Sequence, residues 1–206
     1  MATERFNVVY DGTHAVDVYR TDSSEALPVV VLVGAPGFHR FEANVRLARA
    51  LCSRGVAALI PEFQLASLAA GFGRLQNHLT ADATGLGIDL SKIVILGVSS
   101  GAPLGAVWAF DDDALIRVRG YVGAGGLYGA LIWPLIGGNA SLVIRLVHGE
   151  DDESAPLTAA QATVHGLSKA GYDANLLTAP GSHQDTFDPT HDLGQTTVTT
   201  VLEMTL

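Results

Sequence analysis

Apolar runs alternate along the chain with segments of amphipathic, helix-like spacing. Strands are predicted from the apolar runs at 29–33, 56–60, 93–96, 121–122, 142–147 and 174–178. Helices are predicted from the spacing at 43–54, 65–79, 103–110, 158–170 and 196–204. Most of these strands are apolar at every position, which is typical of strands buried on both faces. The pattern therefore predicts an α/β fold, a mostly parallel central sheet with helices on both faces.

The first residues of the chain and two of its connections refine this prediction. Alternating residues at 6–10 and 15–19, joined by Asp11-Gly12-Thr13, predict an antiparallel hairpin. We expect residues 82–89 to form a connection without regular structure. The connection between the strands at 121–122 and 142–147 is too short for a helical cap domain. A site on this fold is therefore expected to be open or covered only by loops.

Composition fits one domain spanning residues 1–206. Hydrophobic residues make up 48% of the chain and charged residues 16%, as expected for an apolar sheet covered by helices. A net charge of -9 argues against nucleic acid or an anionic membrane surface as the partner, because both require a basic footprint. Cys52 is the single cysteine, and the first residues lack the basic and apolar segments of a signal peptide. Both features indicate a cytoplasmic protein.

Residues 120–143 carry no charge and are numerous enough to span a bilayer. Seven glycines and Pro134 interrupt the segment, which favours a short strand followed by an apolar loop over a membrane span. The pattern leaves three roles open for this loop: lining a pocket, packing in the core, or joining copies of the chain in a homo-oligomer.

Gly97-Val98-Ser99-Ser100-Gly101 follows the apolar run at 93–96 and precedes a helix start rich in small residues. The GxSxG spacing is typical of a sharp strand-to-helix turn that exposes a nucleophilic serine. Ser99 is therefore the candidate nucleophile, and its hydroxyl needs a base to become reactive. Ser100 is a weaker alternative because it lacks the flanking glycine spacing.

Two further loops follow predicted strands. The first begins His148-Gly149 and continues with four acids, Glu150 to Glu153, whereas the second reads Ala179-Pro180-Gly181-Ser182-His183. Because the carboxyl ends of parallel strands meet at one edge of a sheet, these loops are expected to lie near Ser99. The acidic run also fits a solvated loop or a divalent cation site.

With these motifs the chain resembles the α/β hydrolase family over nearly its whole length. The family's order of serine, acid and histidine is matched by Ser99, Asp152 and His183. Its frequent HGxxD pattern is met, since Asp152 stands three residues after Gly149. Small cap-free members of the dienelactone hydrolase-like and carboxylesterase branch are most similar. Dienelactone hydrolases usually carry a cysteine nucleophile, so Ser99 points to ordinary ester chemistry.

The resemblance implies a serine hydrolase that needs no cofactor or metal and cleaves small or medium esters, lactones or thioesters. His183 would take the Ser99 proton, and Asp152 would orient the histidine while an acyl-enzyme forms. Asp151 is the alternative acid and His191 the alternative base. An acyl transferase or cyclase with the same triad, and a hydrolase-fold protein that binds a ligand without turnover, remain alternative functions.

The same resemblance requires two backbone N–H groups for the developing oxyanion. One is expected from Ser100 and the other from the loop after residue 33, where Gly34-Ala35-Pro36-Gly37-Phe38 replaces the family's usual His-Gly. Pro36 has no N–H. We therefore expect the second donor at Phe38, with Gly37 as the alternative.

Aromatic residues in loops are expected to line an apolar acyl pocket around the serine. The candidates are Phe38, Phe63, Tyr128, Trp133 and Phe187. Each of them also fits a place in the core.

Overall fold

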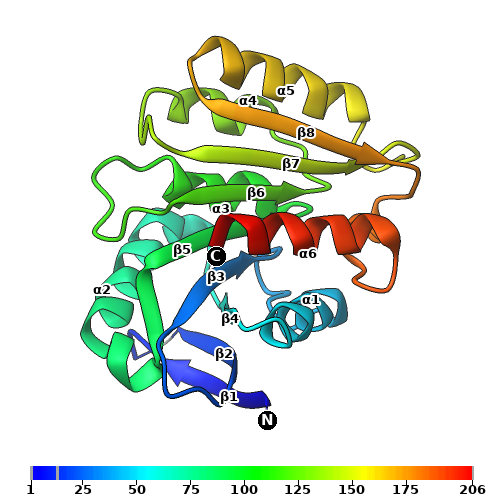
Figure 1. Cartoon of the computed structure of the whole chain (residues 1–206). Coiled ribbons are helices and arrows are strands. Elements are labelled where there is room, and N and C mark those ends of the chain that lie inside the picture. Colours follow the sequence, from blue (N-terminus) through cyan, green and yellow to red (C-terminus); the bar gives the residue numbers. More distant parts are fainter. Residues whose placement is uncertain (1, 13, 206) are drawn as a thin grey trace.

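A computed structural model describes residues 2–12 and 14–205, which fold around one eight-stranded sheet (Figure 1). The strands are β1 (Ala2–Val9), β2 (Ala15–Thr21), β3 (Leu27–Val33), β4 (Ala57–Pro61), β5 (Ile88–Val98), β6 (Gly120–Ala124), β7 (Val143–Gly149) and β8 (Asp173–Ala179). The helices are α1 (Glu42–Cys52), α2 (Leu68–Leu86), α3 (Gly101–Ala109), α4 (Gly129–Ile132), α5 (Leu157–Lys169) and α6 (Asp192–Thr205). Short 3-10 turns are η1 (Leu65–Ser67), η2 (Trp133–Leu135) and η3 (Gln184–Phe187).

The strand order is β1-β2-β4-β3-β5-β6-β7-β8. Strand β2 pairs antiparallel with both β1 and β4, and every other neighbouring pair is parallel. This confirms the predicted mostly parallel sheet and its N-terminal hairpin. Parallel strands place their carboxyl ends along one edge, so the loops after β3, β5, β7 and β8 gather there.

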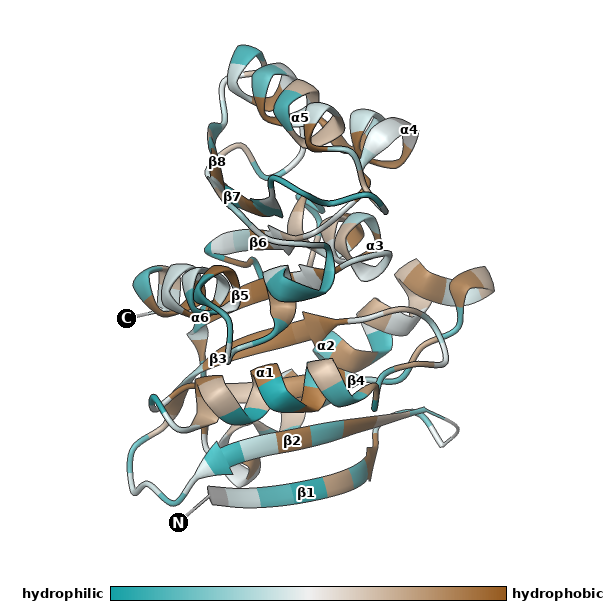
Figure 2. Ribbon diagram, turned by 90° about the vertical axis from the view of Figure 1, so that its right-hand side faces the viewer, coloured by the Kyte–Doolittle hydropathy of each residue, from teal (hydrophilic) through white to brown (hydrophobic). Residues whose placement is uncertain are grey.

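Helices cover both faces of the sheet because the central strands are apolar on both sides. All seven residues of β3 are buried, and Figure 2 shows this strand in brown, apolar colouring. Since side chains alternate along a strand, Val29 and Val31 pack toward the face covered by α2, α3 and α5. Val30 packs toward the opposite face, which α1 and α6 cover.

The predicted connection at residues 82–89 is wrong. Helix α2 continues to Leu86, with non-helical dihedral angles at Asp82 inside it. Gly87 then adopts a φ of 65° and ends the helix, and β5 begins at Ile88. Tertiary packing explains the extension, because Leu86 is buried in the same apolar cluster as the residues on the inner face of α2.

Residues 125–142, which connect β6 to β7, form the apolar loop that the sequence predicts, with α4 and η2 as short turns inside it. No cap domain is inserted at this point of the described chain. Within residues 2–12 and 14–205, no helix has the length and apolar character needed to cross a membrane.

An ion pair between a buried carboxylate and a partly exposed arginine joins the hairpin to the loop after β3. Asp17 of β2 is 1% exposed and accepts hydrogen bonds from the Arg40 Nε at 2.6 Å and Nη2 at 2.7 Å. Burial raises the pKa of Asp17, but the hydrogen bonds from Arg40 and from the Asn7 N–H outweigh it. The net pKa therefore lies below its ordinary value of 3.8.

This shift predicts acid-dependent stability. A carboxyl whose pKa is lower in the folded state stabilises the fold above its unfolded pKa, and this contribution disappears as pH falls through the folded pKa. The unfolding free energy is therefore expected to fall below about pH 4, and less steeply in Asp17→Asn. Urea unfolding between pH 2 and 7 measures both slopes, with Glu25→Gln, which removes an exposed carboxylate, as control. Equal slopes for Asp17→Asn and the wild type would contradict the assignment.

Candidate active site

Ser99 occupies a strained turn between β5 and α3. Its φ is 53°, a left-handed conformation that a residue with a side chain rarely adopts. The Ser99 N–H donates to the Ala124 carbonyl at 2.8 Å, which fixes the turn to the end of β6. Close packing explains both flanking glycines. A Cβ on Gly97 would lie 2.5 Å from the Ala102 Cα, and a Cβ on Gly101 would lie 2.1 Å from the Val33 carbonyl oxygen.

Gly101→Ala is therefore expected to disturb both the fold and the site. The new methyl group meets backbone atoms at the end of β3, which cannot move aside as a flexible side chain can, so overpacking should cost about 1–3 kcal/mol of unfolding free energy. Gly73→Ala is the matched control, because no atom lies within 4 Å of its added Cβ and α2 is helical there. Thermal unfolding should show Gly101→Ala destabilised and Gly73→Ala unchanged or slightly stabilised; equal behaviour would contradict the packing argument.

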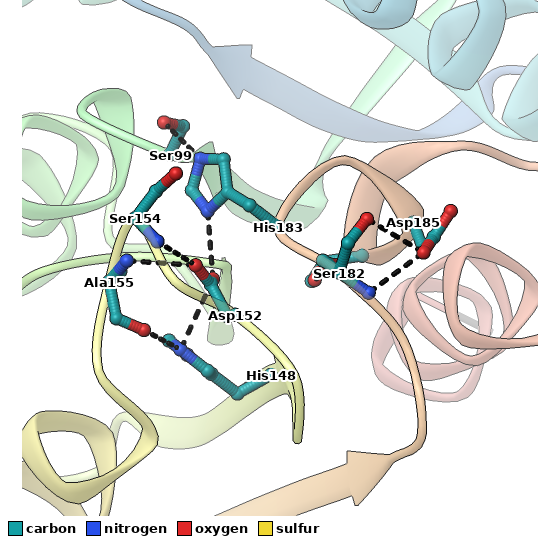
Figure 3. Close-up of polar contacts among 9 residues, drawn as sticks. Ser99, His148, Asp152, Ser154, Ala155, Ser182, His183 and Asp185 are labelled. Atoms are coloured by element: carbon teal, nitrogen blue, oxygen red, sulfur yellow. Dashed lines mark hydrogen bonds and ion pairs between the residues drawn. The ribbon is translucent and has the colours of Figure 1, made fainter.

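Three side chains from three loops form one line of hydrogen bonds (Figure 3). The Ser99 Oγ lies 2.9 Å from the His183 Nε2, and the His183 Nδ1 lies 2.8 Å from the Asp152 Oδ2. A carboxylate only accepts, so the Nδ1 carries the proton and the Nε2 is free to accept from the serine hydroxyl. The structure thus brings together the three residues that the sequence singled out.

Asp152 is held in place by the turn that follows it. The Ser154 and Ala155 N–H groups each donate to its Oδ1 at 2.8 Å, which leaves Oδ2 for the histidine. The side chain is fully buried, so these bonds replace the water that the carboxylate would otherwise need. The alternative acid, Asp151, instead accepts from the Gly181 N–H at 3.3 Å.

The alternative base is also separate from this line of contacts. The His191 Nδ1 accepts the Leu193 N–H at 3.2 Å, near the start of α6. His183 itself precedes η3, and the Asp185 carboxylate binds the Ser182 N–H and Oγ, each at 2.7 Å. These two hydrogen bonds to Asp185 stabilise the turn that carries His183.

A second histidine touches the acid, and sequence reasoning did not assign it a role. His148 at the end of β7 is completely buried, and its Nε2 donates to the Ala155 carbonyl at 2.7 Å. The same nitrogen lies 3.3 Å from the Asp152 Oδ2. Its other ring nitrogen, Nδ1, has no partner among the described residues. The position four residues before the acid, in HGxxD, was the available signal.

The expectation that Phe38 supplies an oxyanion N–H needs correction. Its N–H already donates to the Ala35 carbonyl at 3.0 Å in a tight turn around Pro36 and Gly37, so it is not free for a substrate. In the described part of the chain, no acceptor is found for the N–H of Ala35 or of Ser100. Both residues line the same cleft beside Ser99.

The cleft has a volume of about 250 Å³. Its walls come from the loop after β3, the start of α1, the Ser99 turn and η3. They comprise Gly34, Ala35, Phe38, Phe41, Asn44, Val98, Ser99, Ser100, His183, Gln184 and Phe187. Among the described residues, no aspartate, glutamate, lysine or arginine side chain lines the cleft, so its environment favours an apolar, uncharged group.

Two of the five aromatic candidates, Phe38 and Phe187, line this cleft. The other three do not. Phe63 packs against Phe72 in the core, with ring centroids 5.8 Å apart. Tyr128 is buried against Gly123 and Gly126, and Trp133 lies over Gly166 of α5 with 41% of its surface exposed. Loop position did not reveal which way these side chains point.

Phe41 and Asn44 line the cleft without having been predicted. Asn44 is 3% exposed, and its Nδ2 donates to the carbonyls of Phe38 and His39 at 3.2 and 3.4 Å. Both residues lie at the start of α1, and helical periodicity gave no sign that this end of the helix faces the site.

Solved structures with a similar fold identify the fold class of this chain. Solved structures that resemble the chain include a truncated carbohydrate esterase from gut microbiota, with a TM-score of 0.77, 16% identity and coverage of 98% of this chain and 96% of that one. Another is an α/β hydrolase enzyme from a Medee basin deep-sea metagenome library, with a TM-score of 0.72, 15% identity and 98% coverage of both chains. A third is a hyperthermophilic esterase from the archaeon Pyrobaculum calidifontis, with a TM-score of 0.76, 16% identity and coverage of 100% and 85%.

The chain therefore has the α/β-hydrolase fold, as the sequence motifs predicted. A scan against protein-family models and a search of curated proteins both find no match.

Proposed function

We propose that this protein is a serine hydrolase that cleaves small or medium carboxylic esters, lactones or thioesters through an acyl-enzyme on Ser99. The observation that carries the proposal is the continuous line from the Ser99 Oγ through His183 to the buried Asp152. Several of the similar structures are esterases, which supports the proposal.

In the proposed reaction, the Ser99 oxygen attacks the substrate carbonyl while the His183 Nε2 takes the serine proton. Collapse of the tetrahedral intermediate breaks the bond to the leaving group, which receives that proton from His183. Water then attacks the acyl-enzyme with the same proton transfers and releases the acid and the free serine. Asp152 keeps the proton of the His183 Nδ1 in place and stabilises the imidazolium that forms.

The oxyanion is proposed to bind the N–H groups of Ala35 and Ser100. Both groups lack an acceptor among the described residues and both belong to walls of the cleft. Donors that are fixed before the reaction stabilise charge without reorganisation, and losing one such donor costs about 10²–10³-fold in kcat. Ala35 takes the role that was expected of Phe38 or, as the alternative, of Gly37, which does not line the cleft.

The size and lining of the cleft favour a substrate with an apolar acyl or alcohol group next to the reacting carbonyl. A 150 Å³ apolar cavity accommodates benzene, so about 250 Å³ walled by three phenylalanine rings has room for a ring or a short aliphatic chain. Charged groups would lose their hydration there without a partner.

Stopped-flow hydrolysis of p-nitrophenyl acetate, butyrate and hexanoate tests the proposal. We expect a burst of p-nitrophenol that matches the enzyme concentration, followed by steady turnover. Addition of a primary alcohol separates hydrolysis from acyl transfer, because a transferase would form mainly the new ester. Saturable binding of the esters without any release of p-nitrophenol would contradict the proposal and favour a ligand-binding protein.

A further inference from the structure

The loop between β3 and α1, residues 34–41, carries several parts of the proposed site at once. It contributes Ala35, Phe38 and Phe41 to the cleft. The loop consists of two consecutive tight turns: the Phe38 N–H donates to the Ala35 carbonyl, and the Phe41 N–H donates to the Phe38 carbonyl, both at 3.0 Å. Backbone hydrogen bonds therefore link Ala35 to Phe41 through Phe38.

Asn44 supports this loop from α1. Its amide donates to the Phe38 and His39 carbonyls, and its Nδ2 lies 2.4 Å from where a Cβ on Gly34 would stand. These contacts hold the Phe38 and His39 carbonyls against α1, but they do not connect the loop to the hairpin.

Arg40 supplies the missing attachment by reaching the hairpin. Its Nε and Nη2 bind the two carboxylate oxygens of Asp17, and Nη2 also donates to the Asn7 Oδ1 at 2.8 Å. The Arg40 guanidinium carbon lies 5.6 Å from the centre of the Phe6 ring. One side chain thus binds both strands of the hairpin through three hydrogen bonds and a ring contact.

The hairpin is shaped to receive this guanidinium. The β1–β2 register shifts between Arg5 and Val8, and Asn7 lies in that irregularity with a φ of 54°. The bulge turns the Asn7 N–H toward the Asp17 Oδ1, at 2.9 Å. An unusual backbone conformation, a buried carboxylate and a bidentate arginine therefore converge on a residue of the loop that borders Ser99.

We propose that Arg40 is a positioning residue, which through Asp17 and Asn7 holds residues 34–41 so that the Ala35 N–H and the Phe38 and Phe41 rings face the nucleophile. The role rests on the proposed serine hydrolase function. Arg40 does not touch the reacting atoms, and its contribution is to keep the oxyanion donor and the aromatic wall in register with Ser99. A misplacement of about 1 Å can cost about 10²-fold in rate.

The test compares Arg40→Met, Arg40→Lys and the double variant Arg40→Met/Asp17→Asn with the control Arg49→Met. Arg49 also pairs with a hairpin carboxylate, Glu4, but it lies on α1 away from the loop. The double variant is included because it leaves no unpaired carboxylate buried beneath the loop. The measurements are kcat and KM for p-nitrophenyl acetate and hexanoate, the thermal midpoint, and amide hydrogen exchange of residues 34–41.

We expect Arg40→Met and the double variant to lose about 10- to 100-fold in kcat on both esters, and to raise KM more for the hexanoate. Arg40→Lys should recover part of the loss, because an ammonium makes point contacts but cannot reproduce the fork geometry. Exchange across residues 34–41 should accelerate in the Arg40 variants only. Arg49→Met should keep roughly wild-type kcat, since exposed ion pairs contribute little.

If Arg40→Met or the double variant folds and keeps the kcat of the wild type, the positioning role of Arg40 is overturned. The hydrolase proposal is not affected by that result, because the wild-type protein would still turn over the esters. If the wild type proves inactive, unchanged exchange of residues 34–41 in the variants still overturns it. Failure of all three Arg40 variants to fold would also overturn it, because Arg40 would then be a structural residue alone.

Discussion

Ser99→Ala and His183→Ala are each expected to lower kcat for ester hydrolysis by about 10⁴- to 10⁶-fold. The serine supplies the nucleophile and the histidine removes its proton across the 2.9 Å contact between them, so either loss disables the same step. The double variant should be no slower than the slower single variant, because residues that act as one unit are not additive. Single-turnover kinetics with p-nitrophenyl butyrate measures all three.

Ser100→Ala and His191→Ala are the matched controls. Each changes a neighbouring residue of the same type, and the side chains that they remove lie outside the line of contacts from Ser99 to Asp152. Their kcat should stay near that of the wild type. A larger loss in a control than in its partner would reassign the nucleophile or the base.

Asp152→Asn is expected to reduce kcat by about 10⁴-fold while leaving the fold intact. The carboxylate accepts the His183 Nδ1–H at 2.8 Å and two N–H groups of the following turn. An amide of the same shape offers an N–H where a carboxylate oxygen now stands. The imidazole then favours a proton on Nε2, which can no longer accept from Ser99. Steady-state kinetics, with near-ultraviolet circular dichroism to verify the fold, measures the effect.

Asp151→Asn provides the control for the acid, because the two carboxylates are adjacent in sequence but Asp151 bonds to the Gly181 N–H. It should retain most of the wild-type kcat. Similar losses in Asp151→Asn and Asp152→Asn would argue that the acidic run acts through its charge, and not through one positioned carboxylate.

Much of the fold was readable from the sequence because apolar runs and helical spacing report burial directly. The run at 29–33 is the completely buried β3, and the alternation at 6–10 and 15–19 belongs to the antiparallel hairpin. The boundary around Asp82 was not readable, because a polar, glycine-containing stretch is helical there through packing of Leu86 into the core. Local propensity does not contain that tertiary contact.

The candidate triad was readable for a different reason. Ser99, Asp152 and His183 each follow a strand, and parallel strands bring such loops to one edge. The second backbone donor for the oxyanion could not be predicted from the sequence, because the Phe38 N–H donates to the Ala35 carbonyl within a tight turn. The inward or outward direction of Phe63, Tyr128 and Trp133 was likewise set by packing and not by loop position.

The most direct test of the central proposal is to locate a fluorophosphonate adduct by tandem mass spectrometry of the digested protein. A serine activated by His183 should form a single covalent adduct on Ser99. The adduct should be absent in Ser99→Ala and strongly reduced in His183→Ala, while Ser100→Ala should label like the wild type. An adduct on Ser100 or elsewhere, or no adduct on the folded wild-type protein, would contradict the assignment of Ser99 as the nucleophile.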